Sequence, residues 1–399
     1  MKSDRSRRSL TACCAAHALH DGLSDLSYVL LPLLAQTFGL SLAQVGMIRA
    51  AHRTAMAAFQ IPAGLIAERF GERNLLAAGT AIAGAAFVGL ALINVSHAAA
   101  YWMILAALFF AGLGSAVQHP LCSTIISNAY PEAGRRTALG TYNLFGDVGK
   151  FAFGGLLSLL LMAGYSWQGP VILYGIAGML VAAVIFLRIS AVMPAHAAEA
   201  GTPARRSGWG IRNRRGFAAL CLIEIVDSST RVGFLTLIAF LMIDKGLPTG
   251  WAALSVPLIL VGGMAGKFAC GLLAERVGII RTIIITEVAT GAGILCAVAL
   301  PGMAAFLLLP VIGIVLQGTS SVLYATTGDL VEQDRLPRAF GLIYTLGSVC
   351  GIAAPLGYGL AGDHFGITSA ITLMGLAIFA TLPLCLMLRP AISAEPVRL

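Results

Sequence analysis

The sequence predicts an all-α polytopic membrane protein, with twelve transmembrane helices arranged in two pseudo-symmetric halves of six. Three observations lead to this fold class: the composition, a series of apolar runs and an internal repeat. Of the 399 residues, 58% are hydrophobic and only 11% are charged, whereas a soluble globular chain carries about 25% charged residues. A spanning helix needs about 20 residues, so the chain has room for twelve spans joined by short loops.

Twelve apolar runs follow one another along the chain, and each is closed by a turn or a cluster of charges. The first six lie near residues 11–38, 43–67, 73–95, 98–129, 134–163 and 168–192. The second six lie near residues 217–243, 250–275, 281–300, 303–331, 338–362 and 367–389. Runs of this length and apolarity are typical of membrane-spanning helices, and we expect one helix at each run.

The basic residues predict the orientation of the chain. Lys and Arg gather before the first run, at every second junction and in the C-terminal tail, so that 20 of the 26 basic residues fall on one side of the membrane. Because cytoplasmic loops are the ones rich in Lys and Arg, both termini and the central loop are predicted to be cytoplasmic, in a bacterial inner membrane. The net charge of +8 is therefore a sign of topology and indicates no nucleic-acid partner.

A polar segment and an internal repeat divide the chain in two. Residues 194–216 form the longest polar stretch, near the middle of the sequence. The segment GLIAERFGERNLL, which begins at residue 64, recurs 207 residues later as GLLAERVGIIRTI. We expect an N-terminal half over 1–193, a cytoplasmic linker over 194–216 and a C-terminal half over 217–399. Such repeats are typical of secondary transporters, which bind substrate near the middle of the membrane.

The repeated loop carries a family resemblance. It resembles the signature loop of the major facilitator superfamily through Gly64, Glu68, Arg69, Gly71 and Arg73, and through the second copy Gly271, Glu275, Arg276 and Gly278. The resemblance implies the major facilitator fold. Glycine at 64 is expected to let its helix approach a neighbour closely, and an acid at the helix end can pair across the interface between the halves. These residues are therefore predicted to gate the cytoplasmic face, although Arg69 and Arg73 could equally be topology anchors.

A closer resemblance, to the fosmidomycin-resistance type of exporter, is carried by short motifs in the first four runs. They are the HxxHD of His17, His20 and Asp21, the PLL at Pro32, the FGLS at Phe38 and the GLGSAVQHP that ends at Pro120. The sequence departs from that family at Leu121, where an acid is common. The resemblance implies export of a drug or metabolite.

Ionisable residues inside the apolar runs indicate where the mechanism lies, because each costs roughly 2.5–3.5 kcal/mol at membrane depth unless it faces a partner or a cavity. Four of them share one face of the first run, at spacings of three and four residues: His17, His20, Asp21 and Asp25. Neither acid has a basic residue on that face, and carboxylates flanked by histidines suit a proton relay. His119 is added because the following proline breaks the helical hydrogen bonding beside it. We predict proton coupling at these five residues.

A second group of intramembrane residues is predicted to bind substrate: Tyr28, His52, Arg53, Asp147, Lys150, Asp227 and Arg231. Arg53 and Arg231 lie at similar depth in opposite halves, and a planar guanidinium suits bidentate capture of a carboxylate or phosphonate. An alternative is that the acids only pair with the basic residue three or four positions further along their own helix and hold the structure together.

Metal transport is an alternative that the sequence leaves open. His52 and Met56 share a helix face, and Cys13 and Cys14 lie in the first run, so a soft-metal site is conceivable. No second soft cluster is in register, and a methionine at helical spacing in an apolar helix is more often a packing residue. We therefore expect no metal site and no cofactor.

Together these observations predict a proton-coupled secondary transporter that moves a small anionic or zwitterionic molecule by alternating access. Export, as a drug or metabolite antiporter that confers antibiotic resistance, is the leading expectation, and an organic-anion importer, working as symporter or facilitator, is the alternative. A soft-metal transporter and a transport-inactive scaffold or sensor come after these. The expected partners are the substrate, protons and the lipid bilayer, and the protein is expected to act as a monomer. No motif for enzyme chemistry is present, so an enzyme is not expected.

Overall fold

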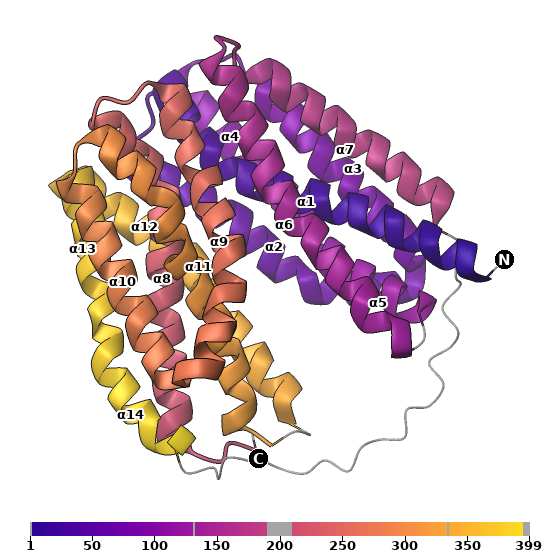
Figure 1. The fold of residues 1–399 in the computed structure, drawn as a ribbon. Helices are drawn as coiled ribbons and strands as arrows, with labels where there is room; N and C mark the ends of the chain where they lie inside the picture. The colour runs from indigo at the N-terminus through magenta and orange to yellow at the C-terminus, as the bar shows by residue number, and fades with distance from the viewer. Residues whose placement is uncertain (1, 131, 190–209, 333–334, 394–399) are drawn as a thin grey trace. The chain divides into compact units, whose positions relative to one another are not determined.

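The computed structural model describes residues 2–130, 132–189, 210–332 and 335–393 (Figure 1). Helices make up almost all of these ranges, and the extended pairing within them is one antiparallel bridge between Ile211 and Val331. Helices dominate because lipid offers no hydrogen bonds, so each spanning segment must satisfy its own backbone groups. The chain forms two compact units, which are described separately.

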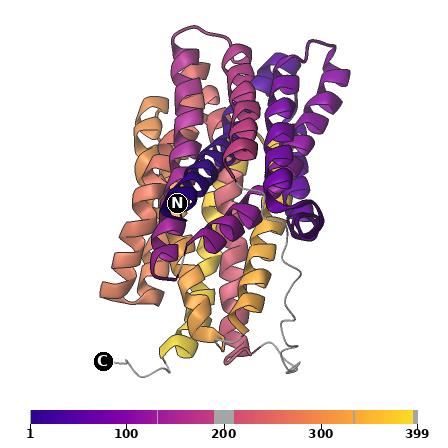
Figure 2. The same ribbon diagram turned by 90° about the vertical axis from the view of Figure 1, so that its right-hand side faces the viewer.

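The first unit takes in the described residues of Met1–Leu40, Met47–Ala204 and Thr249–Pro257. Its helices are α1 (Lys2–Phe38), α2 (Leu42–Phe70), α3 (Glu72–Ala91), α4 (His97–Ala116), α5 (Gln118–Ala129), α6 (Glu132–Met162) and α7 (Gln168–Arg188). The helix α1 packs along α6, and α3 packs against both α4 and α7. Figures 1 and 2 show the helices from two directions. Small residues allow α3 and α7 to pack closely: a Cβ on Gly84 of α3 would lie 3.0 Å from the backbone nitrogen of Met179 on α7.

The second unit takes in the described residues of Ser41–Gly46, Arg205–Pro248 and Leu258–Leu399. Its helices are α8 (Arg214–Asp244), α9 (Thr249–Val277), α10 (Ile279–Ala299), α11 (Gly302–Leu330), α12 (Leu336–Phe365), α13 (Ile367–Ala377), the short η2 (Ile378–Ala380) and α14 (Thr381–Ser393). The helix α8 packs against α12 and α14, and α10 packs against α11. Figure 1 shows α13 and α14 following one another along one side of this unit.

The predicted fold class is confirmed. Ten helical stretches in the described ranges are long and apolar enough to cross a membrane, and α4 with α5, and α13 with η2 and α14, each count as one stretch. The remaining two of the twelve spans are α1 and α2, whose mean hydropathy is lowered by the buried ionisable residues described below. The chain is thus an integral, multi-pass membrane protein.

Several predicted boundaries differ from the observed helices. The helix α1 begins at Lys2 rather than near residue 11, because its charged N-terminal residues continue the helix. The run predicted over 98–129 breaks at Val117, and the run over 367–389 breaks at η2. Pro120 and Pro383 lie in the first turn after each break, where a residue without an N–H is tolerated.

The predicted linker over 194–216 overlaps the second unit. The helix α8 already begins at Arg214, and the side-chain oxygen of Asn213 caps it by accepting from the backbone N–H of Gly216 at 2.9 Å. Residues 194–209 lie outside the described ranges. The division into 1–193, 194–216 and 217–399 stays a prediction.

The contact between α1 and α6 depends on a glycine. A Cβ on Gly149 would overlap the carbonyl oxygen of Ala18, and it would lie 2.6 Å from the carbonyl carbon of that residue. Backbone atoms cannot move aside as a side chain can, so the two helices must separate if Gly149 gains a side chain. On the same helix, a Cβ on Gly140 would meet no atom within 4 Å.

We expect Gly149→Ala to destabilise the protein by about 1–3 kcal/mol, the usual cost of overpacking. Thermal unfolding in detergent, followed by intrinsic fluorescence, should show a lower Tm than wild type. Gly140→Ala is the matched control and should keep or slightly raise the Tm, because alanine is a better helix former than glycine. Equal Tm values for the two variants would contradict the close contact of α1 with α6.

Candidate functional site

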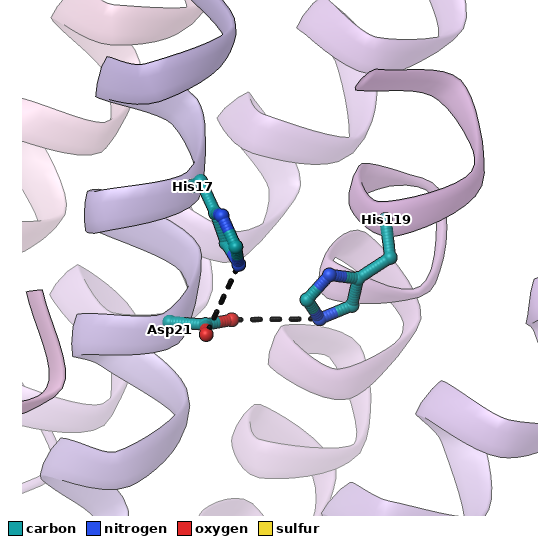
Figure 3. A group of neighbouring side chains, drawn as sticks. All are labelled: His17, Asp21 and His119. Carbon is teal, nitrogen blue, oxygen red and sulfur yellow. Dashed lines mark ion pairs between the residues drawn. The ribbon is translucent and has the colours of Figure 1, made fainter. Parts of the chain in front are cut away.

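Asp21 is the centre of a buried ionic cluster formed by α1, α5 and α6 (Figure 3). Its Oδ2 lies 3.2 Å from Nε2 of His17 and 3.1 Å from Nζ of Lys150. Its Oδ1 lies 3.4 Å from Nε2 of His119. The Asp21 side chain is 10% exposed, whereas that of His119 is 42% exposed. The most accessible member of the cluster is therefore a histidine, which contacts the buried carboxylate directly.

The hydrogen bond of His17 to Tyr142 indicates which of its ring nitrogens faces Asp21 without a hydrogen when the ring is neutral. Nδ1 of His17 lies 2.8 Å from the backbone carbonyl oxygen of Tyr142. A carbonyl can only accept, so Nδ1 carries a hydrogen and, in a neutral ring, Nε2 carries a lone pair. Nε2 faces a carboxylate oxygen of Asp21, which also has only lone pairs. The contact of these two atoms therefore requires one more proton, bound to His17 or to Asp21.

Three of these side chains also have the geometry of a metal site. The ligand atoms of His17, Asp21 and His119 all lie within 4.8 Å of one another. The ammonium group of Lys150, however, contacts the same carboxylate, and a cation so close would repel a metal ion. The donor set with its lysine fits a proton better than a metal.

His20 has a different environment from its neighbours on α1. Its Nε2 lies 2.9 Å from the Thr80 hydroxyl, which itself donates to the carbonyl oxygen of Leu76 at 2.7 Å. Its Nδ1 lies 3.2 Å from the Ser115 hydroxyl. A neutral imidazole, with one nitrogen donating and the other accepting, satisfies both contacts. This geometry is that of a structural histidine, and a role in proton transfer stays a prediction for His20.

Local pairing and pairing between helices occur together at Lys150. Its ammonium group lies 3.3 Å from Oδ1 of Asp147 on its own helix, as the alternative for this pair proposed. It also reaches Asp21 on α1, so it does more than neutralise a neighbour on α6. Asp21 and Asp25 have no lysine or arginine on their own face of α1, but each has a basic partner from another helix: Lys150 for Asp21, and Arg49 for Asp25.

Arg49 joins α2 to α1 and is fully buried, with a side-chain exposure of 0%. Its Nη1 donates to the carbonyl oxygen of Ser24 at 3.0 Å and to Oγ of Ser27 at 2.5 Å. The guanidinium lies 3.7 Å from the centre of the Tyr28 ring, and Nη2 lies 3.9 Å from Oδ1 of Asp25. The sequence placed Arg49 inside an apolar run but did not single it out as a site residue.

Several buried polar atoms around Arg49 lack a hydrogen-bond partner in the described part of the chain. They are Nε and Nη2 of Arg49, the hydroxyl of Tyr28 and the two ring nitrogens of His52, of which a neutral imidazole offers one as a donor. All three side chains are buried. Arg53 lies one turn further along α2 and interacts electrostatically with each of them. Because a buried donor without a partner costs about 1–3 kcal/mol, this group, named here the α2 donor cluster, is suited to bind an anion that accepts several hydrogen bonds.

The second unit has its own buried ionic cluster on α8. Nη2 of Arg231 lies 3.5 Å from Oδ2 of Asp227, the pairing at four-residue spacing that the alternative proposed. The same atom lies 4.0 Å from Oε1 of Glu224, two turns away. Glu287 on α10 interacts with the same three residues. Glu287 was not among the residues predicted from the sequence, although it is the only acid in the run 281–300.

The repeated loop has the same backbone turn in both copies. Gly71 has φ 82° and ψ 141°, and Gly278 has φ 88° and ψ 155°, a left-handed conformation that favours glycine. Each glycine ends one helix and directly precedes the next. An added Cβ at Gly64 or Gly271 would meet no atom of its own unit within 4 Å, and the close helix approach expected at Gly64 stays a prediction.

The charged residues of this loop lie at the surface of their units. Arg69, Glu275 and Arg276 are exposed, and the Arg73 guanidinium lies 4.5 Å from the centre of the Phe186 ring. The side chain of Glu68 lies outside the described residues. Their role as a gate stays a prediction.

Comparison with known proteins places these features in a family. The sequence profile described as Major Facilitator Superfamily matches residues 13–355. The chain is 24% identical to the 4-hydroxybenzoate transporter PcaK of Pseudomonas putida, over 89% of this chain and 84% of that protein. It is 22% identical to the probable 4-methylmuconolactone transporter of Cupriavidus pinatubonensis, over 97% of this chain and 91% of that protein.

A solved structure has the same fold. It is an inward-facing, unoccupied bacterial homologue of the human lysosomal transporter Spinster, with a TM-score of 0.74, 18% sequence identity, and coverage of 98% of this chain and 96% of that chain. The two relatives described above are named for 4-hydroxybenzoate and 4-methylmuconolactone and not as fosmidomycin-resistance exporters. The closer resemblance to that exporter type therefore stays a prediction.

Proposed function

The chain belongs to the major facilitator superfamily of membrane transporters, and from this premise we propose that it imports a small organic anion together with protons. Its two halves alternate between opening to one side of the membrane and to the other. It acts as a monomer in a bacterial inner membrane, with both termini in the cytoplasm. The substrate is a carboxylate of the size of 4-hydroxybenzoate.

The α2 donor cluster is the observation that carries the proposal. The Arg49 guanidinium, an imidazole and a phenol are buried beside the half-buried Arg53, and donors on Arg49, His52 and Tyr28 have no hydrogen-bond partner in the described ranges. A carboxylate offers two oxygens with about four lone pairs and would satisfy several of these donors at once. A neutral substrate could accept hydrogen bonds from them but would not balance the charge of the guanidinium groups. The 4-hydroxybenzoate for which one relative is named is a substrate of this chemistry.

Membrane energetics favour proton coupling for such a substrate. Moving one negative charge inward against an inside-negative potential costs about 2.3 kcal/mol per 100 mV. One proton imported with the anion removes this cost, and a second proton turns the potential into a driving force. Import by symport is therefore preferred over simple facilitation. We therefore propose import in place of the drug export that was expected from the motifs of the first four runs.

The Asp21 cluster is the proposed site of coupling. Asp21 and Asp25 are one helical turn apart on α1, and Asp25 pairs with Arg49 of the α2 donor cluster. Lys150 interacts electrostatically with both acids. At roughly 8 Å and an effective dielectric constant of about 20, a proton bound at Asp21 would stabilise an anion beside Arg49 by about 2 kcal/mol. That free energy corresponds to about a 30-fold gain in affinity, enough to couple the two binding events.

Purified protein in proteoliposomes tests the proposal. With an alkaline interior, we expect radiolabelled 4-hydroxybenzoate to accumulate above its equilibrium level, and a protonophore should abolish the accumulation. Phenol, which lacks the carboxylate, should not compete. Uptake that ignores the proton gradient would contradict the coupling. If no carboxylate in a thermal-shift panel stabilised the protein or was transported, the anion proposal would be wrong.

A further inference from the structure

The ionic cluster on α8 contains more negative than positive charge. It has three carboxyl groups, those of Glu224, Asp227 and Glu287, which are 0%, 1% and 1% exposed. Arg231 is the cation that interacts with them in the described part of the protein. If all three carboxyl groups were ionised, two negative charges would remain in an almost water-free environment. Such burial is very costly, so a proton or another cation must neutralise part of it.

Glu287 shows where that neutralisation is needed. Both its carboxyl oxygens are buried and have no hydrogen-bond partner in the described ranges, and the same holds for Oδ2 of Asp227. Arg231 pairs with Asp227 and approaches Glu224. Glu287 nevertheless interacts with the Asp227 carboxyl. Two carboxyl groups so placed can share one proton, which makes one of them a donor to the other.

The other helices around the cluster supply neutral groups. Those that interact with its acids are Tyr324 on α11, Cys350 on α12 and Cys385 on α14. Cys221 on α8 interacts with Glu224 as well. None of these groups adds a positive charge. A bound cation would compensate the excess negative charge, and a proton requires no further ligand atoms.

The internal repeat gives an independent comparison. Asp227 lies 206 residues after Asp21, and Glu287 lies 207 residues after Thr80. In the first unit, the Thr80 hydroxyl makes a neutral hydrogen bond to His20 on α1. In the second unit, an acid occupies the matching position and faces α8. The C-terminal repeat thus has a carboxyl pair where the N-terminal repeat has a hydroxyl and an imidazole.

From this geometry we propose that Asp227 and Glu287 bind a second transported proton, separate from the proton at Asp21. The proton enters from the side of the membrane to which the transporter is open and binds an oxygen of one carboxylate of the pair, which becomes a carboxylic acid. After the transporter has opened to the other side, the proton dissociates from that oxygen and is released there. The proposal rests on the proposed function in assigning the proton to transport. With one proton at each site, a cycle carries two protons and one monovalent anion, so one net positive charge moves inward.

Voltage dependence tests the second proton. For one net positive charge, an inside-negative potential of about 100 mV should raise equilibrium accumulation of 4-hydroxybenzoate about 50-fold in wild-type proteoliposomes. Glu287→Thr introduces the residue found at the matching position of the first repeat. This variant should still accumulate substrate with a pH gradient but should no longer respond to voltage. Asp244→Asn removes an exposed acid at the end of α8 and should respond as wild type does.

The outcomes separate this proposal from the proposed function. A Glu287→Thr variant that keeps the full voltage response would overturn the second proton site, and so would uptake that requires Na⁺ in place of protons. If wild type transports no carboxylate, proton binding can still be followed by infrared difference spectroscopy of the purified protein. A carboxylic acid band that titrates with pH and disappears in Glu287→Gln supports the site without any substrate. The same band unchanged in Glu287→Gln would refute it.

Discussion

Replacement of Asp21 by Asn is expected to abolish proton-driven accumulation of substrate while leaving exchange of internal for external substrate intact. The reason is that the carboxylate joins His17, His119 and Lys150, and an amide cannot take up and release the proton that the His17 contact requires. Accumulation should fall at least tenfold. The measurement is uptake into proteoliposomes with an imposed pH gradient, together with the signal of a pH-sensitive dye when substrate is added.

Asp147→Asn is the matched control for this change. It removes the other carboxylate that contacts Lys150, at 3.3 Å, but leaves the contacts of Asp21 in place. Its pH-driven accumulation should stay within a few-fold of wild type. Substrate exchange serves as the test of folding, because exchange needs the complete transport path but no proton. The coupling role of Asp21 would be refuted if Asp21→Asn still accumulated substrate and still produced a dye response.

Arg53→Gln is expected to weaken substrate binding about 10- to 100-fold. A hydrogen bond to a charged group contributes about 1.5–3 kcal/mol, and the substitution removes the charge as well as the fork of donors. Arg53 suits this test better than Arg49, which also holds α2 to α1 through Ser24 and Ser27. The change should appear in KM for uptake and in the Kd from thermal shift, with little effect on the Tm of the unliganded protein.

Lys267→Gln provides the control for loss of one positive charge. Lys267 is an exposed residue of α9, away from the α2 donor cluster in sequence and in the other unit. The affinity of the Lys267→Gln variant for carboxylates should equal that of the wild-type protein. If both variants bind 4-hydroxybenzoate as wild type does, the anion site lies elsewhere in the protein.

Hydropathy and charge were sufficient to predict the twelve spans, because lipid imposes a length and an apolar composition on each. They could not predict where a span is interrupted. The break at Val117 depends on local backbone geometry before Pro120, and the early start of α1 depends on helix formation by charged residues, which apolarity does not detect. Hydropathy likewise could not show that α8 begins inside the polar linker, since Arg214 reads as loop by composition.

The individual residues of the site could be predicted from the sequence, but the contacts between them could not. His17, Asp21, His119 and Lys150 could each be selected because an ionisable side chain in an apolar run requires an explanation. Their meeting could not be foreseen, since it depends on how α1, α5 and α6 pack over sequence separations of about 100 residues or more. Glu287 was missed because no charged residue lies one turn away from it on its own helix. Its interaction partners are on α8, which the sequence does not place beside it.

The glycine contact between α1 and α6 has a consequence for the lipid dependence of transport. Gly149 adjoins Lys150 in sequence, and Ala18 is three residues before Asp21, so the same two helices carry both the contact and the ion pair. A slip of one residue would move the groups by 1.5 Å along the axis and about 100° around it. Membranes of different thickness tilt and shear their helices. Because backbone lies against backbone here, α1 and α6 should tilt as a single body, which would shield the proton site from changes in bilayer thickness.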